Sequence, residues 1–172
     1  MNLESVIRSY QDFPKKGVLF RDISPILRDP KVMQYVVDQF YEYYKNKKID
    51  LVAGIESRGF IFACALGLKF NKGMVIIRKQ GKLPGKTLNL PYNIEYGNAV
   101  MEIQCDAINK GENVLIADDL IATGGTAKAS AELIERLGGN VSGFAFVIEL
   151  AGLKGRALLQ GYDVYSLVKY DE

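Results

Sequence analysis

The stretch 114–126, with the sequence VLIADDLIATGGT, constrains the fold of this chain more than any other. It opens with an apolar run, the pattern of a buried parallel strand, and Asp118 and Asp119 follow near its end. A turn with two glycines leads into 127–137, where apolar side chains recur at helical spacing before Gly138. The stretch therefore predicts a strand, a turn and a helix in that order.

The turn has the composition of an anion site. The first N–H groups of a helix have no partner within the helix, and the helix dipole adds partial positive charge there. The two glycines let the backbone approach a ligand closely, and the two threonines add hydroxyl donors. We therefore expect a phosphate monoester to bind at Ala122, Thr123, Gly124, Gly125 and Thr126.

The two carboxylates beside this turn need a different explanation, because they would repel a phosphate. They make sense if Asp118 and Asp119 hold sugar hydroxyls or the water shell of a metal ion, so that the metal is bound indirectly. The alternative is that both are solvated residues at a strand end and that the glycines only form a turn. The order of apolar run, acidic pair, glycine turn and helix favours a ribose 5-phosphate site.

This stretch resembles the 5-phosphoribosyl 1-pyrophosphate (PRPP) signature of the type I phosphoribosyltransferases. Further segments resemble the adenine phosphoribosyltransferases among them, and their shared order extends the resemblance over nearly the whole chain. These segments are FP at 13–14 with GVLFRDISP at 17–25, ESRGF at 56–60, RK at 78–79 with GKLPG at 81–85, and EYG at 95–97.

The alternation of strand and helix patterns predicts an α/β fold with a mainly parallel, twisted sheet flanked by helices, and ligands at the carboxyl ends of the strands. The resemblance implies the same fold. It adds a small N-terminal hood at roughly 1–30 and a flexible loop at roughly 79–97, within a single domain that spans 1–172.

Individual elements follow from local patterns. Apolar spacing predicts a short helix over 3–10, and Pro14, Gly17 and Pro25 indicate a loop over 13–25. Asp29 and Pro30 are a helix opening. We expect a helix near 60–70 and strands at 51–55, 74–77, 91–104, 141–148 and 162–168.

A second strand–turn–helix lies at 51–70, and its turn also suits an anion. Arg58 alone is compatible with a surface cation, but beside this turn it suits a pyrophosphate. The resemblance implies that the pyrophosphate binds at Glu56, Ser57, Arg58 and Gly59, with Arg58 also a catalytic group.

Residues 78–88 combine lysines and arginines with glycines and a proline. They are typical of a solvated mobile loop, and equally of a lid that closes on a polyanion. The two interpretations are compatible. The resemblance implies that Arg78, Lys79 and Lys82 supply cations to the pyrophosphate, partly across the interface of a homodimer.

The base site is the least determined by the residues themselves. Val18, Leu19 and Phe20 either plug the core or form a lid over an aromatic base, with Phe20 stacked on a purine. The resemblance favours the lid and implies that Leu19, Phe20 and Arg21 bind adenine. It also implies that Glu95 lies nearest the reacting purine nitrogen and is the acid/base group.

Composition excludes several classes of protein. A net charge of +2 in 172 residues gives no case for binding nucleic acid, and no apolar run approaches the roughly 20 residues that span a bilayer. The absence of histidine excludes a histidine triad, an imidazole zinc site and a histidine base. With no secretory signal at 1–10 and no CxxC pattern around Cys64 or Cys105, we expect a cytoplasmic protein without a disulfide.

The resemblance implies an enzyme of purine salvage that uses Mg²⁺ and converts adenine and PRPP into AMP and pyrophosphate. A phosphoribosyltransferase for hypoxanthine, guanine or xanthine is the nearest alternative, and the hood segment 17–22 argues against it. A PRPP-sensing regulator on the same fold is a second alternative. It would need a further domain or a basic face for nucleic acid.

Overall fold

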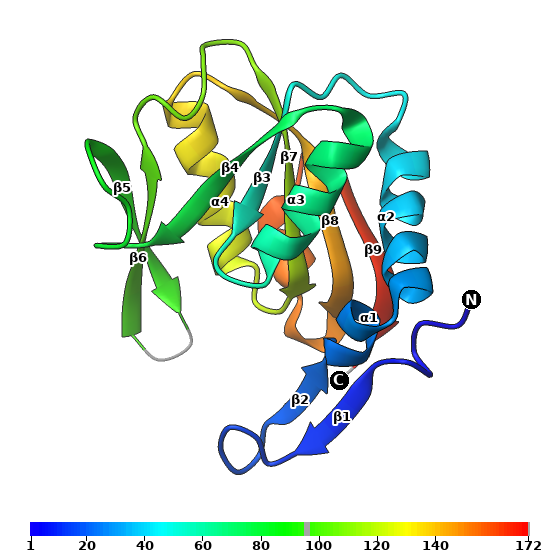
Figure 1. Cartoon of the computed structure of the whole chain (residues 1–172). Helices are drawn as coiled ribbons and strands as arrows, with labels where there is room; N and C mark the ends of the chain where they lie inside the picture. The colour runs from blue at the N-terminus through cyan, green and yellow to red at the C-terminus, as the bar shows by residue number, and fades with distance from the viewer. Residues whose placement is uncertain (95–96, 172) are drawn as a thin grey trace.

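The structure, a computed structural model, describes residues 1–94 and 97–171 (Figure 1). Its main sheet has seven strands: β3 (Leu51–Ile55), β4 (Gly73–Lys79), β5 (Thr87–Ile94), β6 (Gly97–Gln104), β7 (Asn113–Ile121), β8 (Asn140–Leu150) and β9 (Val164–Tyr170). Their order is β5-β6-β4-β3-β7-β8-β9. The pairs β4–β3, β3–β7, β7–β8 and β8–β9 are parallel, whereas β6 is antiparallel to both β4 and β5 at one edge. This confirms the predicted mainly parallel sheet.

Helices cover both faces of this sheet, as the alternation of elements predicts. They are α1 (Ser24–Arg28), α2 (Pro30–Tyr44), α3 (Gly59–Phe70) and α4 (Gly125–Arg136), with the short 3₁₀ turns η1 (Ala151–Leu153) and η2 (Gly155–Leu159). Val52 and Leu115 face the core under α2 and α3, whereas Ala53 and Ile116 face the core under α4. Because successive strand residues point to opposite faces, two buried faces require the near-continuous apolar runs of the sequence.

The helix boundaries follow the expected local signals. The side chain of Asp29 accepts a hydrogen bond of 2.8 Å from the N–H of Lys31, and Pro30 is the first residue of α2. The helices α3 and α4 begin at Gly59 and Gly125, within two residues of their predicted starts. No helix in the described part of the chain has both the length and the apolar character needed to cross a membrane.

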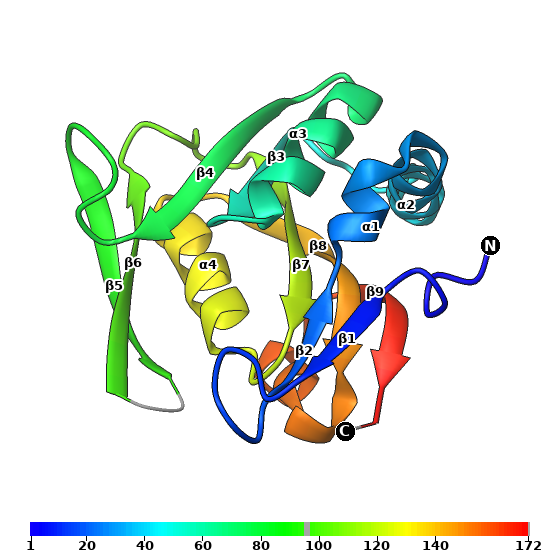
Figure 2. The same ribbon diagram turned by 60° about the horizontal axis from the view of Figure 1, so that its bottom comes forward.

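The N-terminal hood differs from the prediction. Residues 8–11 form strand β1 (Arg8–Gln11), which pairs antiparallel with β2 (Leu19–Asp22), so the helix predicted over 3–10 is wrong. The loop predicted over 13–25 is wrong for residues 19–22, which form β2, and for Ser24 and Pro25, which begin α1. The hairpin projects beyond the ends of β7 and β8 (Figures 1 and 2). Leu3 and Ile7, which suggested a helix, are buried and anchor the hairpin to the core.

The loop expected at 79–97 is shorter in the structure. Residues 87–94 belong to β5, which pairs with β6 from Thr87 opposite Gln104 to Ile94 opposite Gly97. The strand expected over 91–104 is therefore two antiparallel strands. Pro91 is compatible with β5 because this strand lies at the sheet edge, where a missing N–H costs no ladder bond.

Candidate active site

A cavity of about 550 Å³ opens at the carboxyl ends of β3 and β7. This is where parallel α/β sheets bind ligands. It brings together most of the residues predicted for the phosphate, ribose and pyrophosphate sites: Glu56, Ser57, Arg58, Lys79, Asp118, Asp119, Ala122, Thr123, Gly124, Gly125 and Thr126. The loops that follow two neighbouring strands thus face one space.

The loop 122–126 forms one wall of the cavity. Gly124 has φ +83°, a left-handed conformation that favours glycine, and its carbonyl accepts the first helical hydrogen bond from Lys128 N at 2.9 Å. No side chain in the described ranges caps the start of α4. The first N–H groups of this helix are therefore available to an anion in the cavity.

The two carboxylates of β7 differ in their surroundings. Asp118 Oδ1 accepts a hydrogen bond of 2.9 Å from the N–H of Asp119. Burial, and the negative charge of Asp119 beside it, raise the pKa of Asp118 well above its usual value. Asp119 is buried, and its Oδ2 accepts no hydrogen bond among the described residues. The pair is a dense local source of acceptor oxygens next to the phosphate loop.

The loop 56–59 forms the opposite wall. It connects β3 to α3, and its peptide bond between Glu56 and Ser57 is cis. Gly59 packs so tightly against β7 that an added Cβ would lie 2.7 Å from Ala117 O and 2.9 Å from Asp118 Oδ1. This close approach requires glycine and fixes the distance between the two strand-end loops.

Arg58 joins the two walls. Its Nε lies 2.8 Å from Asp119 Oδ2, an ion pair whose angle does not make it a hydrogen bond. The guanidinium carbon of Arg58 also lies 5.6 Å from the centre of the Phe20 ring, a cation–π distance. Arg58 therefore contacts both the acidic pair and the hood.

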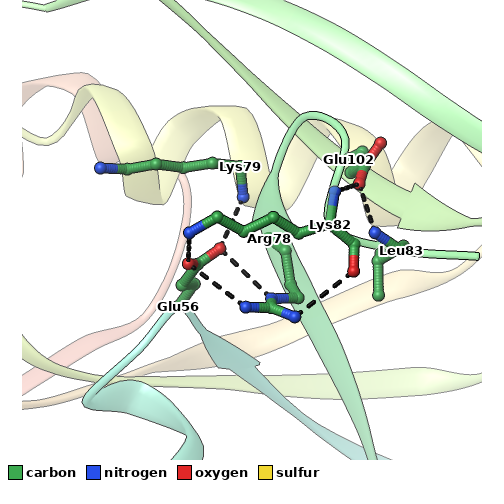
Figure 3. A network of polar contacts seen from close by, with 6 residues as sticks. All are labelled: Glu56, Arg78, Lys79, Lys82, Leu83 and Glu102. Atoms are coloured by element: carbon green, nitrogen blue, oxygen red, sulfur yellow. Dashed lines mark hydrogen bonds and ion pairs between the residues drawn. The ribbon is translucent and has the colours of Figure 1, made fainter.

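Glu56 contacts Arg78, Lys79 and Lys82, the three residues of β4 and the following loop that were predicted to bind the pyrophosphate (Figure 3). Its carboxylate pairs with Lys82 Nζ, lies 3.3 Å from Arg78 Nε and accepts a hydrogen bond of 2.9 Å from Lys79 N. Burial alone would raise the pKa of Glu56, but the hydrogen bonds from Lys82, Lys79 and Arg78 outweigh it and lower the pKa to about 2. Glu56 is thus a carboxylate acceptor for these cations, and only the Lys79 side chain extends away from it (Figure 3).

Glu102 of β6 holds the loop that carries Lys82. Its Oε1 accepts hydrogen bonds from Lys82 N at 2.9 Å and Leu83 N at 2.8 Å (Figure 3). Burial would raise the pKa of Glu102, but the backbone donors Leu83, Lys82 and Gly81 lower it. Glu102 was not predicted as a site residue, because in the sequence it alternates with the apolar residues Met101 and Ile103 as a solvent-facing strand residue would.

The predicted base-binding residues lie on β2 and do not line this cavity. Phe20 packs edge-on against Phe13, with ring centres 5.1 Å apart, and it reaches the cavity through Arg58. Arg21 lies over the ring of Tyr170 at 3.7 Å, and Leu19 is half-buried. Glu95, the predicted acid/base group, lies outside the described residues.

Six further residues line the cavity without having been predicted as site residues: Tyr92, Met101, Leu120, Ile121, Ala127 and Phe146. Thr126 Oγ1 donates a hydrogen bond of 3.2 Å to the hydroxyl of Tyr92, which ties the phosphate loop to β5. The apolar alternation of β5 indicates that Tyr92 points inward. Nothing in the sequence indicates that it meets Thr126, because the contact depends on how the edge hairpin packs.

The acidic pair can hold a metal ion only indirectly. The described residues contain no cluster of three or more acidic, cysteine or histidine side chains that could hold a metal. Mg²⁺ commonly keeps several waters and binds through one or two carboxylates together with substrate phosphates. Asp118 and Asp119 fit that indirect arrangement. Asp119 Oδ2 is ion-paired with Arg58 but accepts no hydrogen bond among the described residues, so it can accept one from a metal-bound water or a sugar hydroxyl.

Known proteins share both the sequence and the architecture. The phosphoribosyl transferase domain family matches residues 22–167. An adenine phosphoribosyltransferase of Nitrosopumilus maritimus is 59% identical over 99% of this chain and 100% of its own length. The structure of an adenine phosphoribosyltransferase from Thermoanaerobacter pseudethanolicus superposes with a TM-score of 0.94 at 46% identity, covering 97% of each chain.

A third similar protein was solved with ligands. It is the adenine phosphoribosyltransferase of Saccharomyces cerevisiae in complex with adenine and an imino-altritol bisphosphate. It has a TM-score of 0.91 and 44% identity, covering 96% of each chain. The chain therefore belongs to the phosphoribosyl transferase family and, within it, to the adenine phosphoribosyltransferases.

Proposed function

We propose that this protein transfers the 5-phosphoribosyl group of PRPP to adenine and releases pyrophosphate, so that it makes AMP in purine salvage. The observation that carries the proposal is that the loops 56–59 and 122–126 face one cavity and are joined by the Arg58–Asp119 ion pair. PRPP carries a phosphate at one end of a ribose and a pyrophosphate at the other. Two anion-binding turns on either side of an acidic pair match that order of groups.

The loop 122–126 binds the 5-phosphate in this proposal. The N–H groups at the start of α4 donate to its oxygens, and the hydroxyls of Thr123 and Thr126 add to them. Asp118 and Asp119 accept hydrogen bonds from the ribose hydroxyls, and their negative charge favours the cationic, oxocarbenium-like C1 of the transition state.

The loop 56–59 binds the pyrophosphate. Arg58 supplies a planar cation that suits phosphate oxygens, and the N–H groups at the start of α3 supply further donors. Arg78 and Lys82 form ion pairs with Glu56, and both leave it for the pyrophosphate when the substrate enters. Lys79 lines the same cavity and adds a third positive charge.

The bond changes are those of a substitution at C1. The ring nitrogen of adenine forms a bond to C1 as the bond from C1 to the pyrophosphate oxygen breaks. The proton of that ring nitrogen then leaves to Glu95, the nearest carboxylate that the family resemblance implies. Phe20, with Leu19 and Arg21, holds the purine ring in front of C1. Most of the rate enhancement then comes from positioning and electrostatics.

Mg²⁺, when bound, screens the charge of the pyrophosphate and so makes it a better leaving group. Asp118 and Asp119 would hold it through its waters, since Asp119 Oδ2 accepts no hydrogen bond among the described residues. This role requires no protein cluster of three ligands.

We also propose that the enzyme is a single-domain cytoplasmic homodimer, with the hood at roughly 1–30 and Arg78 and Lys82 acting partly across the interface. An exposed apolar face supports the homodimer. Ile61 and Leu68 of α3 expose 41% and 80% of their surface, which a second copy would cover. Cys64 and Cys105 form no disulfide, which agrees with a reducing compartment.

Product formation from PRPP and Mg²⁺ tests the proposal, with adenine, hypoxanthine, guanine, xanthine, orotate and uracil offered separately. AMP from adenine alone is the expected result. Turnover of a different base would retain the phosphate and pyrophosphate sites and overturn the assignment of the hood. PRPP binding without turnover of any base would point to a regulator.

A further inference from the structure

The phosphate loop 122–126 rests directly against the 3₁₀ turn η2. A Cβ added to Gly124 would lie 2.3 Å from Gly155 O, and a Cβ added to Gly155 would lie 2.1 Å from Ala122 O. Real Cβ atoms do not approach a carbonyl oxygen this closely, so only glycine fits at both positions. The backbone of Gly155 therefore packs directly against the phosphate loop and supports it, and Gly155 is not among the residues that line the cavity.

The next residue, Arg156, fixes η2 in place. Its Nε donates to Glu149 Oε1 at 2.9 Å, and its Nη2 donates to Glu149 Oε2 at 2.5 Å. Its Nη1 donates to the carbonyl of Val164 at 2.7 Å. This bidentate contact with Glu149, together with the bond to Val164, links η2 to the carboxyl end of β8 and to the start of β9.

Glu149 holds Arg156 in place because its carboxylate is buried and charged. Its side chain is 8% exposed, and its carboxylate has Arg156 as its main partner, with Lys169 at 3.9 Å. Hydrogen bonds from Arg156 outweigh burial and lower the pKa of Glu149, so it is ionised at neutral pH. A buried carboxylate that loses its partner is strongly unfavourable, which makes the geometry of the pair well defined.

We propose that the Glu149–Arg156 ion pair positions the loop 122–126 for the 5-phosphate, acting through the backbone of Gly155. Both are positioning residues, since neither lines the cavity. The inference rests on the proposed function, because it takes 122–126 as the phosphate site. It assigns a role to the segment LKGR at 153–156, which the site described above does not use.

The proposal predicts weaker binding of the 5-phosphate and unchanged binding of adenine. Backbone donors that move by about 1 Å can cost a large factor in binding and rate. Loosening η2 therefore weakens ligands that carry the 5-phosphate. The hood contacts Arg58 and Tyr170, whereas η2 packs against α4, so we expect adenine recognition to be retained.

The test compares Arg156→Ala, Arg156→Lys and Glu149→Gln with the wild-type protein. Glu149→Gln keeps the size of the side chain and removes its charge, so it remains informative if Arg156→Ala folds poorly. Arg136→Ala is the matched control, because Arg136 forms an exposed pair with Glu132 on α4, far along the helix from the loop. Titration calorimetry gives the Kd for AMP, and steady-state rates give KM for PRPP and for adenine.

We expect Arg156→Ala and Glu149→Gln to raise the Kd for AMP and the KM for PRPP about tenfold, with the KM for adenine unchanged. Arg156→Lys, which keeps the charge but loses the bidentate contact with Glu149, should give an intermediate effect. The control should bind AMP as the wild-type protein does.

Wild-type AMP affinity in Arg156→Ala and Glu149→Gln would overturn the inference while the proposed function stands. Equal losses of AMP and adenine recognition would overturn it too, because they would indicate a general loss of structure. Failure of the wild-type protein to bind AMP would instead overturn the proposed function, and the inference with it.

Discussion

Arg58 Nε lies 2.8 Å from Asp119 Oδ2, and this contact joins the loop that follows β3 to the end of β7. Arg58 exposes 43% of its side chain, whereas Asp119 exposes 7%. The cation is therefore the partner that solvent and ligands can reach, and the carboxylate is the buried partner. When a pyrophosphate reaches the cavity, Arg58 can turn to it and leave Asp119 free for a ribose hydroxyl.

Asp119→Asn should reduce kcat by about 10²-fold, because it removes a charge that favours the cationic C1. Arg58 is exposed enough to be solvated when it loses this partner, so the fold should persist. Rates at saturating PRPP and adenine, together with a thermal melt, measure both effects. Asp106→Asn, in an exposed loop after β6, is the control. An unchanged kcat would contradict the role given to Asp119.

Phe20→Ala should raise the KM for adenine more than the KM for PRPP. Stacking of a base on an aromatic ring contributes about 1–3 kcal/mol, which corresponds to about a fivefold to 150-fold change. Tyr10→Ala is a matched control, because Tyr10 lies directly opposite Phe20 across the hairpin and is exposed. A larger effect on PRPP than on adenine would show that the hood does not hold the base.

Glu56→Gln should strengthen inhibition by pyrophosphate. The change removes a negative charge from the cavity and releases Arg78 and Lys82 from their ion pairs. The two cations then attract the pyrophosphate without competition from Glu56. The inhibition constant of pyrophosphate against PRPP should therefore fall several-fold. A rise in that constant would mean that Glu56 instead holds these cations in the orientation that pyrophosphate needs.

The lowered pKa of Glu56 predicts how the free energy of unfolding changes with pH. The pKa of Glu56 is lowered to about 2, so its stabilising effect is present above its ordinary pKa and is lost as the pH falls from about 4.5 towards 2. The loss should be about 1–2 kcal/mol, since Lys82 and Arg78 are partly exposed and solvent screens the pairs.

Urea unfolding at pH 6 and at pH 3 measures this effect. Glu56→Gln should reduce the difference in unfolding free energy between the two pH values. Glu132→Gln, which breaks an exposed pair on α4, should leave the difference as in the wild-type protein. An acid response of Glu56→Gln equal to that of the wild-type protein would contradict the assigned ion pairs.

The sequence predicted the central elements well because their signals are local. The apolar run 51–55 coincides with β3, and the glycine turn after Asp119 leads into α4 at Gly125. A strand buried on both faces needs a continuous apolar stretch, and a helix that begins at an anion site needs small residues. Such requirements can be read from neighbouring residues alone.

The hood could not be predicted in this way. The residues of β1 are all exposed, so they carry no alternation of apolar and polar side chains. Their strand geometry comes from pairing with β2, eight or more residues further along the chain. The spacing of Leu3 and Ile7 suggested a helix because two anchoring side chains four residues apart satisfy that pattern by themselves.

The polar contacts of the site also depend on the folded chain. Glu56 and Lys82 are 26 residues apart, and Gly124 and Gly155 are 31 residues apart. Their contacts exist because the parallel sheet brings the ends of distant strands together. The sequence therefore identifies candidate residues, while the pairing of Glu56 with its cations and the support under the phosphate loop require the structure.

A crystal structure of the protein with AMP and pyrophosphate bound together tests the central claim most directly. We predict that the phosphate of AMP lies on the N–H groups of 122–126 and the pyrophosphate on 56–59, with Asp118 and Asp119 between them at the ribose. Either anion bound elsewhere, or the two loops holding the same group, would contradict the assignment of this cavity as the transfer site.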